Sequence, residues 1–372
     1  MIIIGPSPPP YNGMSIVTET FIKSRIHDEF DIRHLDTADR RSIMNMGRFD
    51  IMNITLALKH AVVFVWMLLK YNPDMVYLPI AQNIAGFMRD SLFLIPAGIL
   101  KKRTIIHLHG SYFHDFYINL RKTAQKYVKF SLQYVSGAIV LGTCLKNIFD
   151  GLISKEKIHV VPNGIRDMFK GLDFRRKKSD FTQILFLSNL MKEKGIIQLL
   201  KVIPAIISHN RNVRFVFAGE WFRESDKKEA FVLINKENLH PYITFTGVIK
   251  GEEKCEYLIK SHIFVMLSIS PPYEGQPMVI LEAMSAGLPV ISTSKGAIPE
   301  TIIDDINGFL IDGNNPGMLE EKLKLLIDDH EMRNAMGAAS RKYYEEKFTQ
   351  NRFIDTLKKT FVDIAEIKGI KP

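Results

Sequence analysis

The stretch "PPYEGQPMVILEAMSAGLPVI" (271–291) decides how this chain folds and where its chemistry is expected. Pro277 suits the first turn of a helix, because the N–H that proline lacks has no partner at a helix start. Gly275, Gln276 and Met278 can present backbone N–H groups at the same helix start, where anions bind readily. The stretch therefore predicts a loop that presents backbone N–H groups and is followed directly by a buried helix.

Two glutamates frame this stretch. Glu274 is expected in the loop before the helix, and Glu282 one or two turns along it. A glutamate buried among Ile, Leu, Ala and Met is costly unless its carboxylate has partners. Sugar hydroxyls that donate hydrogen bonds would be such partners, so the pair points to a ligand rich in hydroxyl groups.

On both sides of this motif, apolar, β-branched runs alternate with stretches of helical periodicity, among them 15–28, 50–71 and 116–135. The expected strands are 2–5, 30–36, 74–79, 103–109, 137–142, 157–162, 182–188, 213–219, 242–247, 262–268, 288–293 and 308–311. Such alternation predicts an α/β protein whose parallel sheets are covered on both faces. The polar segment 162–180, which contains Pro-Asn-Gly, is the best linker candidate and divides the chain into two similar arrays.

In open parallel sheets, ligands bind at the carboxyl ends of strands, so the loops there are the candidate sites. The first loop follows "IIIG" (2–5), is stiffened by three prolines, and carries Gly13 just before an expected helix. The loop "LSNLMKEKGI" (187–196) opens the second array in the same way. Its Lys194 lies at a helix start, where a cation is unfavourable unless an anion is bound nearby.

The length of the chain and the distribution of its charge restrict the number of domains and the classes of partner. At 372 residues the chain is comfortable as two domains. Residues 1–170 hold 21 Lys or Arg against 13 Asp or Glu, a net charge of +8 out of the total of +9. This asymmetry suits a polyanionic partner such as an anionic membrane, a phosphorylated substrate or nucleic acid, although a solvated surface gives the same composition.

The apolar runs 61–69 and 92–100 fit buried helices better than elements that touch a membrane, and no segment contains about 20 apolar residues in a row. The N-terminus makes a poor signal peptide. Cys144 and Cys255 form neither a metal spacing nor a disulfide framework. A reducing, cytoplasmic location is the simplest expectation.

The stretch "YEGQPMVILEAMSAGLPVI" (273–291) resembles the signature of retaining GT-B glycosyltransferases of glycosyltransferase family four. Further resemblances follow in the family's order: "HLHGSY" (107–112), "VPNGI" (161–165), "LSNLMKEKG" (187–195) and "GAIPETIIDDINGFLI" (296–311). The resemblance implies a GT-B architecture, with two Rossmann-like domains whose parallel sheets face each other across a cleft. We expect domains at 1–165 and 180–345, with the C-terminal helix, about 349–372, packing back on the first.

The resemblance also implies roles for individual residues. Gly13 would let the donor pyrophosphate approach the first loop, and Lys194 would neutralise that pyrophosphate as it leaves. Glu274 would orient the donor sugar together with the backbone after it, and Glu282 would bind the ribose hydroxyls. His109 would lie near the reacting sugar and the acceptor. The catalytic residues expected are thus His109, Lys194 and Glu274, and the donor-binding residues expected are Gly13, Asn189, Lys194, Glu274, Gly275, Gln276, Pro277, Met278 and Glu282.

Two points of this assignment stay open. His107 is two residues before His109 on the same strand face, so either could be the active-site histidine. The family usually has an arginine where this chain has Asn189, which can donate a hydrogen bond but brings no charge. Lys192 or Lys295 could compensate, or Lys194 could carry more of the electrostatic stabilisation.

The expected activity is transfer of a sugar from a nucleotide diphosphate sugar, UDP-linked in preference to GDP-linked, to an acceptor hydroxyl with retained anomeric configuration. The expected acceptor is a bacterial-type glycan or a lipid-linked glycan, and an anionic membrane surface is a candidate partner. Neither a cofactor nor a metal is expected, since no Asp-x-Asp signature is evident. A nucleotide-sugar 2-epimerase of the same architecture is the alternative. A basic nucleic-acid-binding protein is disfavoured by the absence of a binding signature.

Overall fold

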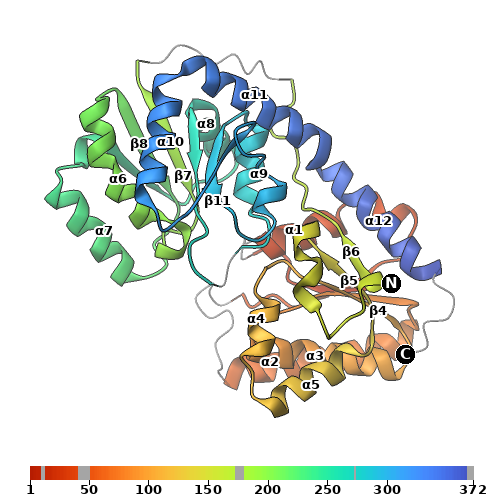
Figure 1. The fold of residues 1–372 in the computed structure, drawn as a ribbon. Coiled ribbons are helices and arrows are strands. Elements are labelled where there is room, and N and C mark those ends of the chain that lie inside the picture. Colours follow the sequence, from red (N-terminus) through yellow and green to blue (C-terminus); the bar gives the residue numbers. More distant parts are fainter. Residues whose placement is uncertain (10–12, 41–50, 172–179, 272–273, 367–372) are drawn as a thin grey trace. The chain divides into compact units, whose positions relative to one another are not determined.

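The computed structural model describes residues 1–9, 13–40, 51–171, 180–271 and 274–366. The chain divides into two compact units. The first comprises Met1–Asn163 and Gln350–Pro372, and the second comprises Gly164–Thr349. In each unit the described residues form one six-stranded sheet of parallel strands, drawn with its helices in Figure 1. The predicted α/β fold with two Rossmann-like arrays is confirmed.

The first unit begins with β1, whose three isoleucines are buried. Its sheet has the order β2-β1-β3-β4-β5-β6. Its strands are β1 (Ile2–Gly5), β2 (Arg33–Asp36), β3 (Met75–Pro79), β4 (Arg103–His107), β5 (Val135–Val140) and β6 (Ile158–Val160). Its helices are α1 (Gly13–Ile22), α2 (Ile51–Tyr71), α3 (Ile84–Ile99), α4 (Phe113–Ile118), α5 (Lys122–Leu132) and α12 (Gln350–Glu366).

The second unit has the sheet order β12-β11-β10-β7-β8-β9. Its strands are β7 (Thr182–Leu187), β8 (Val213–Ala218), β9 (Ile243–Gly247), β10 (Ile263–Val265), β11 (Val290–Thr293) and β12 (Gly308–Ile311). Its helices are α6 (Ile196–His209), α7 (Glu224–Lys236), α8 (Gly251–Lys260), α9 (Met278–Ser285), α10 (Pro316–Asp328) and α11 (His330–Lys347).

Short 3-10 helices complete both units. They are η1 (Arg25–Asp28), η3 (Thr143–Phe149), η4 (Lys155–Lys157), η5 (Lys192–Lys194), η6 (His240–Tyr242) and η7 (Ile298–Glu300). Some predicted boundaries were wrong in detail. The expected helix 15–28 is α1 followed by η1, and the expected helix 116–135 is split into α4 and α5.

The strand order of the second sheet places a topological switch point between β7 and β10. From β7 the chain builds outward through β8 and β9, and from β10 it builds in the other direction through β11 and β12. The loops after β7 and β10 therefore lead to helices on opposite faces of the sheet, and the carboxyl ends of these two strands are where open α/β sheets bind ligands.

Helix α12 belongs to the first unit, although it follows the second unit in the sequence. Phe361 of α12 packs with ring centroids 5.6 Å from Phe21 of α1 and 5.9 Å from Tyr77 of β3. Before the second unit's sheet begins, Ile165 pairs with Thr349 in an isolated β-bridge. Residues 172–179 of the predicted linker lie outside the described residues.

Helix α2 is not buried as the sequence predicts for its run 61–69. Phe64, Met67 and Leu68 are buried, but Val62 is 71% exposed and Leu69 is 69% exposed, so the run 61–69 is not a buried helix. The window 52–71 is long and apolar enough, by length and composition, to cross a membrane, and only 17% of it is buried. The sequence reading found no such segment because Lys59 and His60 interrupt the apolar run. Figure 1 shows α2 beside α3 and α5 in the first unit.

Candidate active site

Two loops flank the switch point of the second sheet. After β7 the chain passes through Ser188 and Asn189 to η5, and after β10 it runs from Met266 to Glu274. Backbone hydrogen bonds join the two loops: Leu267 N–H donates to the Lys194 carbonyl at 3.1 Å, and Ile269 N–H donates to the Glu193 carbonyl at 3.0 Å. The sheet topology and these two hydrogen bonds therefore hold the backbone of Lys194 beside the loop after β10.

Gly195 ends η5 in a left-handed conformation, with φ at +86°. A Cβ at this position would lie 2.6 Å from Leu267 Cβ, which is far inside van der Waals contact. Only glycine therefore allows the turn to approach the loop after β10 this closely. The glycine of "KEKG" is explained by this approach, and it sets the start of α6 directly behind Lys194.

The Lys194 ammonium forms an ion pair with the Glu274 carboxylate. The sequence placed these residues 80 positions apart, and the structure brings their side chains together within one unit. Burial lowers the pKa of Lys194 to about 8, against the opposing effect of the nearby Glu193 carboxylate. An ammonium group with a lowered pKa, paired to a carboxylate beside a crevice, is typical of a functional site.

Glu274 is held from two sides by its backbone. Its N–H donates to Ser268 Oγ at 3.3 Å, and the Ser268 N–H donates to Thr293 Oγ1 at 2.9 Å. On the other side, Ala297 N–H donates to the Gly275 carbonyl at 2.6 Å. A Cβ on Gly296, whose φ is +55°, would lie 2.0 Å from the Glu274 carbonyl oxygen. The loop is thus clamped between the turn after β11 and Ser268.

Helix α9 begins as the sequence predicts, with Pro277 directly before Met278. Gly275, Gln276 and Pro277 are buried, and Met278 is half-buried. Gln276 Nε2 donates a hydrogen bond to Thr301 Oγ1 at 3.0 Å, and this bond holds the start of α9 against the residue that follows η7. The expected donor-binding backbone therefore lies at a helix N-terminus next to Glu274.

Glu282 is buried on α9, with one carboxylate oxygen satisfied and one not. Its Oε1 accepts a hydrogen bond from Lys254 Nζ of α8 at 2.5 Å. Its Oε2 is buried and has no hydrogen-bond partner among the described residues. A buried carboxylate oxygen without a donor is costly. A bound hydroxyl group would supply the missing donor, so the environment of Glu282 suits a ligand such as ribose.

The replacement for the family's arginine was left open by the sequence. Asn189 is exposed in the loop after β7. Lys192 is paired with Glu229, and Lys295 is exposed on the turn next to Gly296. Arg223, which the sequence reading did not single out, forms an ion pair with Glu193, the residue before Lys194. The loop of Lys194 thus gains a cation from the segment that follows β8.

The two candidate histidines, both in the first unit, differ in their exposure. His107 is completely buried on β4, and its Nδ1 lies 2.7 Å from the Tyr77 hydroxyl. His109 follows β4 in the loop at the carboxyl edge, half-buried, with its ring centroid 4.0 Å from that of His107. Burial lowers the pKa of His109 to about 4, so its imidazole is neutral at physiological pH. His109 is therefore the histidine that a ligand at this edge could reach.

Gly13 is the first residue of α1 and is exposed. A Cβ built on it would meet no atom within 4 Å. Packing within the described chain does not demand glycine here, whereas the close approach of a ligand would. Residues 10–12 of the same loop lie outside the described residues.

Sequence reasoning missed Lys254, Ser268 and Arg223. Lys254 lies in α8, 28 residues before its partner Glu282, in a helix whose charged residues read as an ordinary solvated face. No local pattern marks these three residues. Where the structure is described, no group of three or more His, Cys, Asp or Glu is arranged to hold a metal ion.

Comparison with known proteins bears on the second unit first. Residues 172–343 match the family described as "Glycosyl transferases group 1". This segment is similar to the group 1 glycosyltransferases. The match contains Lys194, Glu274 and Glu282, and it confirms the predicted family resemblance.

Curated relatives extend the similarity toward the first unit. The chain is 28% identical over 263 residues to the uncharacterized glycosyltransferase MJ1178 of Methanocaldococcus jannaschii, covering 70% of this chain and 69% of that protein. It is 26% identical over 245 residues to the phosphatidylinositol N-acetylglucosaminyltransferase gpi3 subunit of Schizosaccharomyces pombe, covering 65% of this chain but only 49% of that protein. The chain thus spans about half the length of several relatives that it matches. The family and these names support an enzyme of the glycosyltransferase class, as predicted.

Solved structures share the fold over nearly the whole chain. The crystal structure of Anabaena Alr3699/HepE in complex with UDP has a TM-score of 0.75 at 16% identity and covers 97% of this chain and 99% of that chain. A further structure of the same protein is a complex with UDP-glucose. The likeness confirms the GT-B fold.

Proposed function

We propose that this protein transfers a sugar from a UDP-sugar to an acceptor hydroxyl with retention of anomeric configuration. The observation that carries the proposal is the edge of the second sheet, where an ion-paired Lys194 and Glu274 lie in adjoining loops and Glu282 keeps a buried oxygen without a partner. Retention follows from the family resemblance. The UDP preference is supported by structures of similar fold that hold UDP or UDP-glucose.

Each residue of the edge has a distinct task in this proposal. Glu282 accepts a hydrogen bond from a ribose hydroxyl through Oε2, while Lys254 keeps its Oε1 in place. Lys194 turns from Glu274 to the diphosphate and stabilises the negative charge that develops as the bond between the anomeric carbon and the phosphate oxygen breaks. Glu274 is then free to accept hydrogen bonds from the sugar.

The chemical balance of the transfer needs no added reactant. The acceptor oxygen forms a bond to the anomeric carbon on the face that the leaving group departs from. Its proton passes to an oxygen of the departing diphosphate, which leaves as UDP. His109, neutral because its pKa is lowered to about 4, can exchange hydrogen bonds with the substrates without adding a positive charge.

Lys194→Ala tests the proposal directly. Removing one charge-stabilising group lowers kcat by about 10²-fold, the scale seen when a single oxyanion-type donor is lost. The circular dichroism spectrum and the melting temperature should change little. Lys192→Ala, which removes a neighbouring lysine paired to Glu229, is the matched control and should retain activity. Near-normal turnover of Lys194→Ala would remove this residue from the mechanism.

The donor is identified by thermal-shift measurements with a panel of UDP- and GDP-sugars, followed by NMR analysis of the product's anomeric configuration. A product with inverted configuration would overturn retention. Epimerised donor formed without any acceptor would identify a 2-epimerase instead.

We also propose a lipid-linked or polymeric glycan acceptor and peripheral attachment to an anionic membrane on the cytoplasmic side. The exposed apolar residues of α2 support attachment through the first unit, together with Lys122, Lys126 and Lys129 on one face of α5. Each basic residue near an anionic surface contributes about 1 kcal/mol. Sedimentation with vesicles of rising anionic lipid content should show binding that salt weakens. Protein left in the supernatant at low salt would favour a soluble acceptor.

A further inference from the structure

A hollow lies at the amino edge of the first sheet, away from the strand ends where ligands of α/β folds bind. Its residues surround the starts of three strands: Arg103 begins β4, Val135 begins β5, and Lys157 directly precedes β6. His109 lies beyond the other end of β4. Within the first unit, this hollow is therefore separate from the candidate active-site edge.

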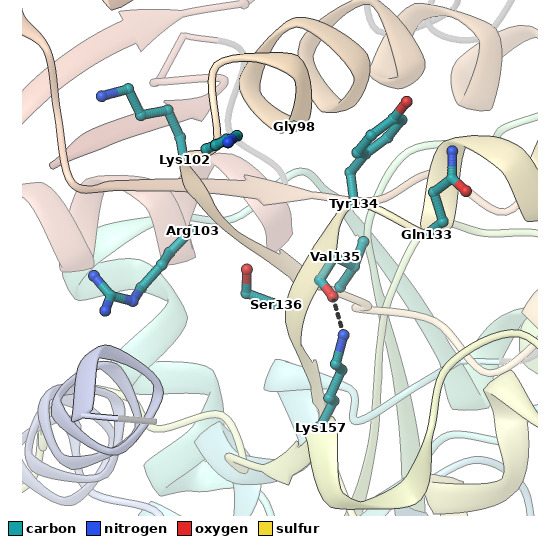
Figure 2. Close-up of a pocket in the computed structure, with 9 residues that line it drawn as sticks. Gly98, Lys102, Arg103, Gln133, Tyr134, Val135, Ser136 and Lys157 are labelled. Carbon is teal, nitrogen blue, oxygen red and sulfur yellow. Dashed lines mark hydrogen bonds between the residues drawn. The ribbon is translucent and has the colours of Figure 1, made fainter. Parts of the chain in front are cut away.

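The hollow is strongly cationic. It has a volume of about 50 Å³ and is lined by Gly98, Lys101, Lys102, Arg103, Gln133, Tyr134, Val135, Ser136 and Lys157. Four of these nine residues carry a positive charge, and none is acidic. Figure 2 shows Lys102 and Arg103 on one side, Tyr134 and Gln133 on the other, and Lys157 reaching Val135 from below.

None of the four cations forms an ion pair within the part of the chain that the structure describes. The Lys102 ammonium donates to Asn72 Oδ1 at 2.5 Å, and the Lys157 ammonium donates to the Val135 carbonyl at 3.0 Å, so both have neutral partners. Asp74, whose carbonyl accepts the Arg103 N–H, is not among the lining residues. The charged groups are spread around the hollow, and Figure 2 shows Lys102 and Arg103 directed away from Lys157. A bound anion would supply a counter-charge that the lining residues lack.

Lys101 stands where its backbone favours glycine. Helix α3 ends with the two hydrogen bonds of a Schellman motif, from Lys101 N–H to the Gly98 carbonyl and from Lys102 N–H to the Ala97 carbonyl, both 2.9 Å. Lys101 occupies the left-handed position of this motif, with φ at +55°. Glycine adopts that conformation without strain. A lysine at this position makes the fold less stable than a glycine would, but it places a positive charge at the hollow.

Apolar side chains surround the hollow. Ile99, the last residue of α3, is 65% exposed, and the following Leu100 is 38% exposed. Phe130 of α5 is 48% exposed and packs edge-on against Tyr134 at 5.7 Å. Gly98 permits this arrangement, since a Cβ there would lie 2.2 Å from the Tyr134 ring. Apolar and aromatic groups next to lysines are typical of surfaces that face a membrane interface.

The carboxyl end of α2 also combines aromatic side chains with a lysine. Lys70 lies 4.5 Å from the Trp66 ring centroid and 5.3 Å from the Tyr71 ring centroid. Tyr71 is followed by Asn72, the partner of Lys102. The carboxyl ends of α2, α3 and α5 all lead into strands at the amino edge of the sheet, so their exposed apolar residues gather around it.

We propose that this hollow is a phosphate-binding site that receives the phosphate of an anionic lipid headgroup, with the apolar residues around it resting in the interface. Lysine and arginine groups donate charge-assisted hydrogen bonds to phosphate oxygens. The alternative source of the same group is a free phosphate compound in solution. This inference rests on the proposed attachment of the first unit to an anionic membrane. It is independent of the proposed sugar transfer, and it needs no nucleotide for its test.

The test compares two variants that each remove two positive charges from the first unit. Lys101→Gly with Arg103→Gln changes the hollow, and Lys126→Gln with Lys129→Gln changes the exposed face of α5. Lys101→Gly relaxes the left-handed position, so on its own it should keep or raise the melting temperature. The single variant Lys101→Gly is therefore measured in both arms as well, because a binding loss in it cannot result from misfolding.

The first arm measures sedimentation with phosphatidylcholine vesicles that contain phosphatidic acid, at fixed ionic strength. The second arm measures the rise in melting temperature caused by inorganic phosphate relative to chloride at equal ionic strength. We expect the hollow variant to lose about tenfold more vesicle affinity than the α5 variant, because it loses hydrogen bonds to phosphate as well as charge. It should also lose the phosphate-induced stabilisation, which the α5 variant keeps.

The outcomes separate the sources. Loss in both arms supports a lipid headgroup site. Loss of phosphate-induced stabilisation, with equal vesicle affinity in both variants, overturns the lipid source in favour of soluble phosphate. Equal behaviour of both variants in both arms overturns the site and leaves only diffuse attraction between the first unit and anions. No arm contains a nucleotide sugar, so failure here leaves the proposed transfer intact, and failure of the transfer leaves this result intact.

Discussion

The partnered and unpartnered oxygens of Glu282 make nucleotide binding the sharpest test of the candidate site. Replacing Glu282 with glutamine keeps the shape of the side chain and removes its charge. Lys254 then loses its counter-charge, and the buried carboxylate becomes a neutral amide. Replacing Glu282 with alanine removes both oxygens.

The size of each loss follows from the hydrogen bond at Oε2. A hydrogen bond to a charged group contributes about 1.5–3 kcal/mol, and a neutral one contributes about half as much. Since 1.4 kcal/mol corresponds to a tenfold change in affinity, Glu282→Ala should weaken UDP binding by about 10- to 150-fold. Glu282→Gln should weaken UDP binding by about 5- to 10-fold, because a neutral acceptor remains.

Isothermal titration calorimetry with UDP measures these losses without requiring the acceptor. The control is Glu320→Gln, which breaks a Lys–Glu pair on α10, with Lys324 four residues away. Combining Glu282→Gln with Lys254→Met removes the uncompensated lysine, so stability should recover while the affinity loss remains. If Glu282→Ala and Glu320→Gln bind UDP equally well, Glu282 does not hold the nucleotide and the assignment fails.

Three further predictions concern the same unit. With the pKa of Lys194 lowered to about 8, kcat/KM for the donor should fall as pH rises through about 8, because the amine then loses the charge that stabilises the diphosphate; a flat profile up to pH 10 would contradict this. Gly296→Ala pushes a Cβ against the Glu274 carbonyl, so transfer should fall by about 10²-fold while UDP affinity by calorimetry stays nearly unchanged. Arg341→Ala leaves the Asp167 carboxylate without its paired donor, so urea unfolding should show a loss of about 3 kcal/mol.

The fold could be predicted from the sequence because its signals are local and repeated. The inner strands of a parallel sheet are buried on both faces, so they read as continuous apolar runs such as Ile2–Gly5 or Met75–Pro79. All twelve expected strands are present, with ends shifted by up to three residues. Helix boundaries were harder, because the break between α4 and α5 depends on tertiary packing that no periodic pattern reports.

The candidate site was predictable only in part. Glu274 and Glu282 were found because turn and helix-start residues frame them, and those residues act on their immediate neighbours. The pairing of Lys194 with Glu274 follows from the strand order, which brings the loops after β7 and β10 together. Lys254 was out of reach, since its role arises from a contact between two helices that the sequence does not encode locally.

Helix α2 shows why burial resists prediction from an apolar run. Phe64 and Leu68 are four residues apart and lie on the face that packs into the unit, whereas Val62 and Leu69 lie on the face turned to solvent. Both faces are apolar, so their composition cannot tell which one is covered. Exposing large apolar side chains costs about 25 cal/mol for each Å² left in water, and a soluble surface would carry polar residues at these positions instead. The second apolar face of α2 is therefore one of the observations on which the proposed membrane attachment rests.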